Sequence, residues 1–507
     1  MNSISTPKPG KNKFDLSREV KQTGNMGMLY PCFIQDVVPG DSYRVNTQQM
    51  IRFSPLLAPM MHNVDFKLDF FFVPYRIIFD EWKDFITGGE DGNDLPSYPR
   101  FKVNQTFANN FLHKGSLADY LGVPPTKTSS NATGGAWSNI SSTAENQQEI
   151  SALPFRAYQL IWHEYFRDQN VGSEIVQYTN SGIETSATVH NRVCTLRRSN
   201  WEKDYFTSAL PFLQRGGEVV LPILDMGIAS DYFDGSVVGD GVNSDPVPSL
   251  IDNHLSILEL RKASALQRWL ELMARAGSRY REQIHAIFGE RIPDYTVQVP
   301  QYLGGGKTPI MISEVLSTYA QTTSPQTEGS TDRPQGDMTG HGLGLGDNIG
   351  FQQSFQEHGI ILGLCRVIPK SSYIQGLSRF WQKFDKFDHY FPQFANLGEQ
   401  EIFDKELYVK GNSDDSGIFG YQQRYAEYKY SHNRVAGDFR DSLAHWELSR
   451  RFTGHQTLNQ SFIECDPQET SRIFAITDDN EDKLWISLYH KVDALRPMPY
   501  HSNPSLS

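Results

Sequence analysis

The chain has 507 residues, enough for about three average domains or for one large domain with long insertions. Its 59 acidic side chains outnumber its 47 Lys and Arg, and the resulting net charge of −12 excludes a protein whose whole surface attracts nucleic acid. The 31 Phe, 23 Tyr and 8 Trp supply large side chains for cores and subunit contacts, which favours a globular protein over a disordered one.

The first thirteen residues form a basic segment. Residues 1–13 carry Lys8, Lys11 and Lys13 together with Pro and Gly, and they contain no acid. Such a composition predicts a flexible arm, with ordered structure beginning near Phe14.

Strand signals follow the arm. Strands are expected at 32–38, 43–53 and 64–73. The third is the clearest, because apolar and charged residues alternate in it with a period of two. This pattern predicts a core-facing side made of Phe66, Leu68, Phe70 and Phe72, opposite a side that carries Asp65, Lys67 and Asp69.

The middle of the chain changes to helical spacing and polar loops. Helices and loops are expected in 76–215, helices in 255–293, a surface loop in 216–254 and a Gly-rich loop in 321–350. Strand signals then return at 356–368, 421–430, 471–477 and 484–492. Strands at both ends with helices between them predict one mainly β domain, 14–507, whose connections are expanded by insertions.

No motif supports catalysis, a metal or a cofactor. The segment 304–308 ends like a phosphate-binding loop, but its first glycine is replaced by Gln301 and Pro309 follows at once, so we interpret it as a turn. The alternating glycines of 340–346 lack a strand-turn-helix context and are interpreted as a flexible loop. The four cysteines lie at least 100 residues apart, which favours a reducing compartment. No apolar run is long enough to span a membrane, and no secretory signal is evident.

A second basic segment mixes cations with aromatic rings at 421–434. Its candidates for contact with nucleic acid are Arg424, Tyr425, Tyr428, Lys429, Tyr430 and Arg434. Tyrosines could stack on bases while the cations pair with phosphates. A packed sheet surface or a contact between subunits is the alternative, and we favour it over the first.

Several short segments together resemble the major capsid protein family of the Microviridae, in particular its gokushovirus-like branch. The segments are Phe14-Asp-Leu-Ser17, Val38-Pro-Gly-Asp41, Phe71-Phe-Val-Pro74, Asp80-Glu-Trp82, Phe85-Ile-Thr-Gly-Gly89, Ala118-Asp-Tyr-Leu121, Leu153-Pro-Phe-Arg-Ala-Tyr158, Phe166-Arg-Asp-Gln-Asn170, Asp204-Tyr-Phe-Thr-Ser208, Gln301-Tyr-Leu-Gly-Gly-Gly306, Ala395-Asn-Leu-Gly-Glu-Gln400 and Arg424-Tyr-Ala-Glu-Tyr428. Their order and their spread from about 14 to 500 carry the resemblance.

The resemblance implies an eight-stranded antiparallel jelly roll of the viral capsid type with long insertions. It further implies that sixty copies form a T=1 icosahedral shell around a circular single-stranded DNA genome, and that the virion is assembled in the bacterial host cytoplasm. The implied partners are further copies of the chain, the genome, a small basic DNA-packaging protein, a minor pilot protein and a host cell-surface receptor. A carbohydrate-binding jelly-roll module is the alternative, since it would also be acidic, aromatic and rich in loops.

Overall fold

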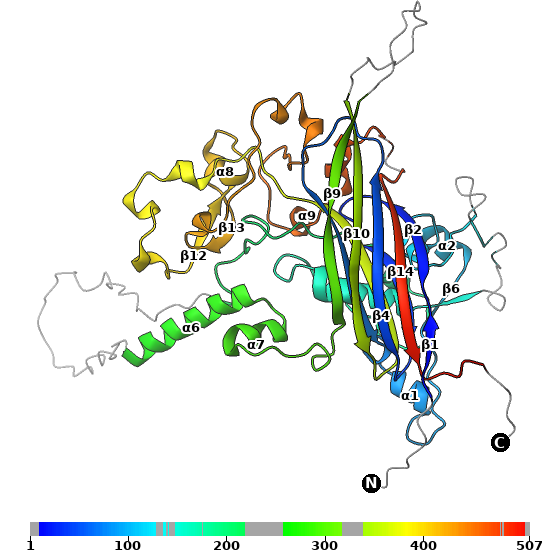
Figure 1. Cartoon of the computed structure of the whole chain (residues 1–507). Coiled ribbons are helices and arrows are strands. Elements are labelled where there is room, and N and C mark those ends of the chain that lie inside the picture. The colour runs from blue at the N-terminus through cyan, green and yellow to red at the C-terminus, as the bar shows by residue number, and fades with distance from the viewer. Residues whose placement is uncertain are drawn as a thin grey trace, which may run out of the picture.

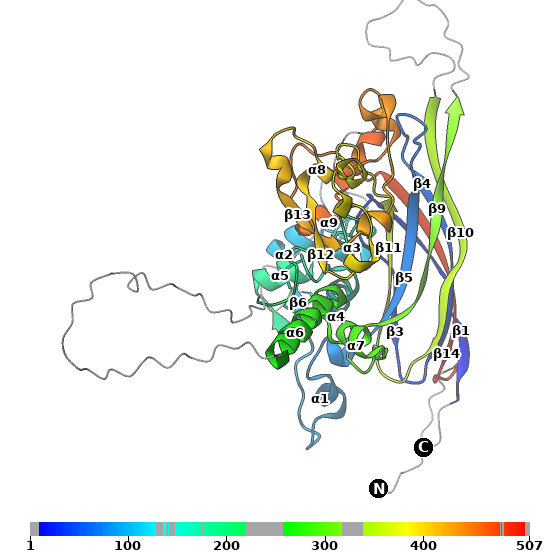
Figure 2. The same cartoon turned by 90° about the vertical axis from the view of Figure 1, so that its left-hand side faces the viewer.

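The computed structural model describes residues 10–127, 135–137, 140, 148–174, 176–217, 257–316, 338–476, 478 and 481–501. Its centre is a large curled antiparallel sheet, with helices and small strands gathered on one side of it (Figures 1 and 2). The expected fold class is therefore confirmed, because the protein is mainly β and its sheet is consistent with a jelly roll of the capsid type.

The large sheet has nine strands in eight positions. The order is β1-β14-β4-β10-β9-β5-β11-β3, and β2 also pairs with β14. β1 and β2 occupy one edge in succession, since β1 pairs with residues 493–496 of β14 and β2 with residues 484–490. The bounds are β1 (Asn12–Asp15), β2 (Arg18–Gly24), β3 (Tyr30–Val37), β4 (Ser42–Phe53), β5 (Val64–Pro74), β9 (Gln301–Leu316), β10 (Met338–Ser354), β11 (Gly359–Pro369) and β14 (Leu484–Arg496).

Arg18 joins the two edges of the curled sheet. It belongs to β2, and its guanidinium donates to Oε1 of Gln35 at 2.9 Å and to the carbonyl of Ile34, both on β3. The same guanidinium lies 4.5 Å from the ring centroid of Phe33. One side chain therefore bridges the opening that would otherwise expose the core between β2 and β3.

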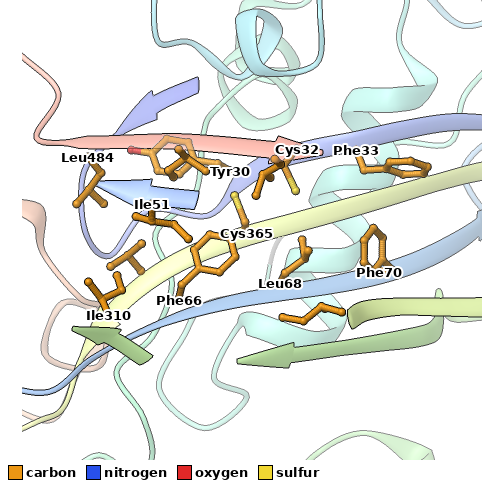
Figure 3. Packing of buried hydrophobic residues seen from close by; sticks show 14 of the residues in the cluster. Tyr30, Cys32, Phe33, Ile51, Phe66, Leu68, Phe70, Ile310, Cys365 and Leu484 are labelled. Carbon is orange, nitrogen blue, oxygen red and sulfur yellow. The ribbon is translucent and has the colours of Figure 1, made fainter. Parts of the chain in front are cut away.

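The main core fills the inside of the curl (Figure 3). The structure places Phe66, Leu68, Phe70 and Phe72 of β5 in this core, all at most 2% exposed. The ring of Phe70 packs edge-on against Phe33 at 5.7 Å between centroids. Gly363 on β11 lies opposite Phe70, and a Cβ there would come within 2.9 Å of the Phe70 ring, so the glycine makes room for it.

A second core lies behind β5 and β11. Phe71 and Val73 of β5 point into it, so this strand is covered on both faces rather than on one. The insertion that follows β5 supplies most of the other residues of this core. Its elements are α1 (Trp82–Thr87), α2 (Gln105–Phe111), α3 (Leu117–Tyr120), α4 (Leu153–Ile161), a π-helical turn (Trp162–Phe166), α5 (Ala187–Val193), β6 (Arg100–Lys102), β7 (Glu149–Ser151) and β8 (Ile183–Glu184).

A third cluster stands beside the sheet and is built from residues near 205–210 and from 402–463. Its elements are β12 (Glu399–Phe403), β13 (Ile418–Gln423), α8 (Asp404–Leu407) and α9 (Gln460–Ile463), followed by α10 (Pro467–Thr470). Helices α6 (Ile257–Ala276) and α7 (Tyr280–Phe288) extend from the same side of the molecule (Figure 1).

Several expectations from the sequence are wrong. Residues 301–308 belong to strand β9 and not to a turn, and 340–346 belong to β10 and not to a flexible loop. Of the loop expected at 321–350, residues 338–350 are therefore part of a strand, while 218–256 and 317–337 lie outside the described residues. The strand expected at 471–477 is replaced by a short 3-10 turn at Ser471–Ile473. The first strand begins at Asn12, close to the expected start of ordered structure near Phe14.

Candidate assembly surface and nucleic-acid contacts

An exposed aromatic surface covers residues 379–397, between β11 and β12. Phe384 is 90% exposed, Phe380 69% and Trp381 64%. Further exposed apolar side chains of the same segment are Phe387, Tyr390, Phe391 and Leu397. An isolated soluble protein rarely exposes so many large rings together, because each would be more stable out of water.

Hydrogen bonds hold this aromatic surface in shape. The carboxylate of Asp388 accepts from the backbone N–H groups of Phe384 at 3.0 Å and Asp385 at 2.9 Å. Lys383 anchors the segment to its neighbours, since its ammonium lies 3.6 Å from the ring centroid of Tyr428 and 3.8 Å from Glu427. The rings are thus presented by an ordered loop, which is a typical arrangement for a protein–protein interface.

The lysines of the arm are only partly described. Lys8 lies outside the described residues. Lys11 donates to the carbonyl of Gly40 at 2.5 Å, and Lys13 pairs with Asp493 at 2.8 Å on the surface. The structure therefore brings Lys11 and Lys13 to the edge of the large sheet rather than leaving them on a free arm.

The tyrosines of 421–434 divide between the interior and the surface. Tyr425 is buried under Tyr390, with 5.1 Å between ring centroids, so its face is closed to a nucleic-acid base. Tyr428 and Tyr430 are exposed, but Tyr428 already carries Lys383 on its ring. Packing within the third cluster accounts for much of this segment.

The cations of the same segment point in different directions. The ring of Tyr425 lies 5.2 Å from the guanidinium carbon of Arg424. Lys429 donates to Oε1 of Gln423 at 2.8 Å, and exposed Arg434 lines a different hollow near Lys370. The structure does not gather these cations into a single groove.

Ion pairs connect β5 with Glu202 and with Lys370, the residue that follows β11. Glu202 accepts hydrogen bonds from both Lys67 and Lys370, and Lys370 also lies 3.3 Å from Asp65. Partial burial raises the pKa of Glu202, but the two lysine hydrogen bonds outweigh it and bring the pKa down to about 2. The predicted polar side of β5 therefore holds an internal ion-pair network.

No group of three or more His, Cys, Asp or Glu is arranged to hold a metal ion in the described part of the chain. The four cysteines are free and buried, and burial raises the pKa of Cys194 and Cys465 above the ordinary thiol value. No described helix is long and apolar enough to cross a membrane.

The aromatic surface is the feature that sequence reasoning missed. The stretch 379–397 shows no clear period of two or 3.6 residues and was not singled out. The feature that could have revealed this surface is the high density of Phe, Trp and Tyr in 379–397, because aromatic residues are enriched at protein–protein interfaces.

A mainly β fold with long insertions and an ordered, exposed aromatic surface is typical of the class of structural proteins that pack against other protein subunits. The comparison with known families places the chain within this class. The family model described as capsid protein (F protein) matches residues 2–506, and the chain belongs to that family.

Similar proteins span nearly the whole chain. The capsid protein VP1 of Chlamydia phage 1 is 30% identical, with 98% of this chain and 96% of that protein covered. The capsid protein VP1 of Bdellovibrio phage phiMH2K is 32% identical, with coverage of 98% and 95%. The capsid protein VP1 of Spiroplasma virus 4 is 26% identical over 98% of this chain. The resemblance to Microviridae capsid proteins is confirmed, and the protein is a structural component of the virion capsid and not an enzyme.

Proposed function

We propose that sixty copies of this capsid protein form a T=1 icosahedral shell around a circular single-stranded DNA genome, after assembly in the bacterial host cytoplasm. The single observation that carries the assembly is the ordered aromatic surface of 379–397, whose exposed rings need a partner. A second copy of the chain is the partner that capsid membership makes available. Closed point-group symmetry then lets one kind of contact repeat until the shell is complete.

The genome sets an electrostatic requirement on the inside of the shell. A net charge of −12 per subunit opposes the enclosure of a polyanion unless cations face the DNA. Lys8, Lys11 and Lys13 are the first candidates, and Arg424, Lys429 and Arg434 are the second. A small basic DNA-packaging protein would supply further positive charge, while a minor pilot protein and a host receptor complete the proposed partners.

Two measurements on purified particles test this proposal. The particle mass, after subtraction of the nucleic acid and of the minor proteins, should equal sixty subunit masses. The extracted nucleic acid should be degraded by a single-strand-specific endonuclease but resist exonucleases. A mass that fits another subunit number would contradict the T=1 shell. A double-stranded or linear nucleic acid would contradict the proposed genome.

Binding to carbohydrate is the second candidate, since exposed rings such as Trp381 can stack on sugars. In the aromatic surface of 379–397, however, the rings lie against one another, for example Phe387 and Phe394 at 5.6 Å between centroids. This arrangement suits a broad contact with another protein better than a sugar site. Failure of the purified protein to form particles, together with retention on a glycan column, would favour the carbohydrate-binding module.

A further inference from the structure

One face of the large sheet has no covering layer in the described part of the chain. The helices and small strands lie on one side, and the outer face of β14, β4 and β10 is bare on the other (Figure 2). Alternation along the strands places large side chains on this bare face. Trp485 is 45% exposed and Tyr489 44%, whereas their neighbours Ile486 and Leu488 are buried in the main core.

Strand register brings cations next to the exposed tryptophan. Trp485 on β14 lies directly opposite Arg52 on β4. Two residues further along, Ser487 lies between Met50 on β4 and Lys21 on β2. Side chains at such cross-strand positions are close enough to contact one bound molecule together.

A groove of about 640 Å³ opens at this place. Trp485, Met50, Arg52 and Lys21 line it from the bare face, Arg18 and residues 31–34 line it along the seam between β2 and β3, and the turn at 114–122 brings Lys114. The groove therefore combines one exposed indole ring with four cations. Arg18 is already bonded to β3, and the other three, Lys21, Arg52 and Lys114, come from three separate parts of the chain. This combination is typical of sites that stack a base and pair with the adjoining phosphates.

The groove's cations have little internal compensation. Arg52 and Lys114 make no side-chain hydrogen bond or ion pair with any described residue, and Lys21 has only an exposed contact with Glu19 at 3.4 Å. Two carboxylates also line the groove, and both accept hydrogen bonds from neutral groups of the groove and form no ion pair with its cations in the described part of the chain. Asp119 accepts from the backbone N–H of Gly115 at 2.9 Å, and Asp482 accepts from the hydroxyl of Thr23 at 2.5 Å.

The basic character continues along the bare face. Arg44 on β4 and Lys491 on β14 are exposed, and Lys491 is close enough to Asp15 to attract that carboxylate electrostatically. Arg44 lies opposite Asp493, the residue that pairs with Lys13 of β1. The face therefore leads from the groove to the strand that follows the basic N-terminal segment, in a chain whose overall charge is negative.

We propose that the groove beside Trp485 binds a nucleotide of single-stranded DNA, and that the bare face of β14 and β4 lines the inside of the shell. The base stacks on the indole ring of Trp485, while Arg52, Lys21 and Lys114 pair with phosphates on either side. Single-stranded DNA suits the groove because its bases are free to leave the stack. This inference rests on the proposed enclosure of single-stranded DNA.

Other occupants fit the groove less well. A small basic protein would meet three cations of its own sign, which is unfavourable. A second copy of the chain would have to bring carboxylates to the groove, and the aromatic surface that needs a protein partner lies elsewhere, at 379–397. Both occupants remain outcomes of the test below.

Binding of a fluorescein-labelled oligothymidine of about 12 nucleotides to the purified capsid protein tests the site, followed by fluorescence anisotropy. Trp485→Thr should bind about tenfold more weakly, because a base–aromatic stack is lost. Arg52→Gln should reduce the slope of log affinity against log salt by about 0.7, the value for one phosphate contact on a single strand. Leu345→Thr is the control, an exposed position on the same face outside the groove.

A second measurement guards against misfolding of the variants. The unaltered protein is photo-crosslinked to a bromodeoxyuridine oligonucleotide, and the adduct should map to the peptide that contains Trp485. Unchanged binding by Trp485→Thr, or adducts found only elsewhere, would overturn the site while single-stranded DNA in the particles still upheld the proposed function. If Trp485→Thr and Arg52→Gln failed to assemble but bound DNA normally, the groove would be a contact between subunits instead. Particles without single-stranded DNA would overturn both proposals.

Discussion

Nδ1 of His490 lies 2.9 Å from Oγ1 of Thr47, directly across the β14–β4 pair and inside the main core. Nε2 of the same ring lies 3.1 Å from the carbonyl oxygen of Cys32. The ring is fully buried next to Phe33, with 5.1 Å between ring centroids. Burial disfavours the imidazolium form and lowers the pKa of His490 from 6.5 to about 4.

This pKa predicts acid sensitivity of the main core. Above pH 6.5 the ring is neutral in both the folded and the unfolded chain, so it makes no difference there. As the pH falls from 6.5 towards 4 the unfolded chain binds a proton that the folded chain does not, and stability falls. The full effect is roughly 3 kcal/mol.

Urea unfolding at pH 7.5 and pH 4.5 measures this effect. His490→Gln should show a smaller loss of stability between the two pH values than the unaltered protein, even if it is less stable at both. His389→Gln changes an exposed histidine and serves as the control. An equal loss of stability in the protein and in His490→Gln would contradict a pH response centred on His490.

Replacing Phe70 by Asp should stop particle formation. The variant would bury a carboxylate between the rings of Phe33 and Phe351 in the main core. Phe70→Leu keeps the site apolar and should still assemble, with reduced stability because of the cavity it leaves. A normal yield of intact particles from Phe70→Asp, measured by sedimentation, would count against the placement of this face of β5.

The aromatic surface gives a prediction that separates assembly from folding. Replacing Phe384 and Trp381 together by Ser should leave a folded subunit that does not assemble, because both side chains are largely exposed and leave no internal cavity. Light scattering and circular dichroism report the two properties. Leu95→Ser, at another position that is 82% exposed, is the control and should assemble. Normal particles from the double variant would remove 379–397 from the subunit interface.

The basic arm predicts an effect on the genome rather than on the fold. Replacing Lys8, Lys11 and Lys13 by Ala should lower the DNA content of purified particles and make it less sensitive to salt. The loss of the exposed ion pair between Lys13 and Asp493 should cost little stability, since such pairs contribute weakly. The ratio of nucleic-acid to protein absorbance, recorded for particles at several salt concentrations, measures the DNA content and its sensitivity to salt. Values equal to those of the unaltered particles would exclude a role of the arm in DNA contact.

Much of the sheet was predictable because its strands alternate visibly. The pattern of β5 separates Phe70 from Lys67, and in the structure Phe70 lies in the main core while Lys67 pairs with Glu202. Strands β3, β4 and β14 were also expected near their observed places. The alternation within β5 could not show that the strand is covered on its second face, because the covering layer belongs to the insertion that follows β5 and not to the strand itself.

β9 and β10 were missed because glycines occupy their inward positions. A Cβ at Gly342 would come within 2.6 Å of the Phe53 ring, and one at Gly306 within 3.0 Å of Ile349. The alternation in 340–346 is therefore a strand pattern in which glycines, which have no side chain, take the inward positions that apolar residues usually occupy. Propensity alone assigns such glycines to turns.

The DNA-contact candidates show a similar limit. The sequence offered Tyr425 as a candidate for stacking on a base, with packing as the favoured alternative. Its backbone takes a positive φ of 60° just after β13, and the side chain is buried. Conversely, the pairing of Trp485 with Arg52 joins residues more than four hundred positions apart, and only the register of β14 on β4 brings them together.

Electron microscopy of purified particles tests the central claim most directly, at a resolution that traces the chain. The account predicts sixty subunits in a T=1 shell, with residues 379–397 against a neighbouring subunit and the bare face of β14 and β4 turned towards the DNA. Another subunit number, or a reconstruction with Trp485 on the outer surface and 379–397 exposed to solvent, would contradict it.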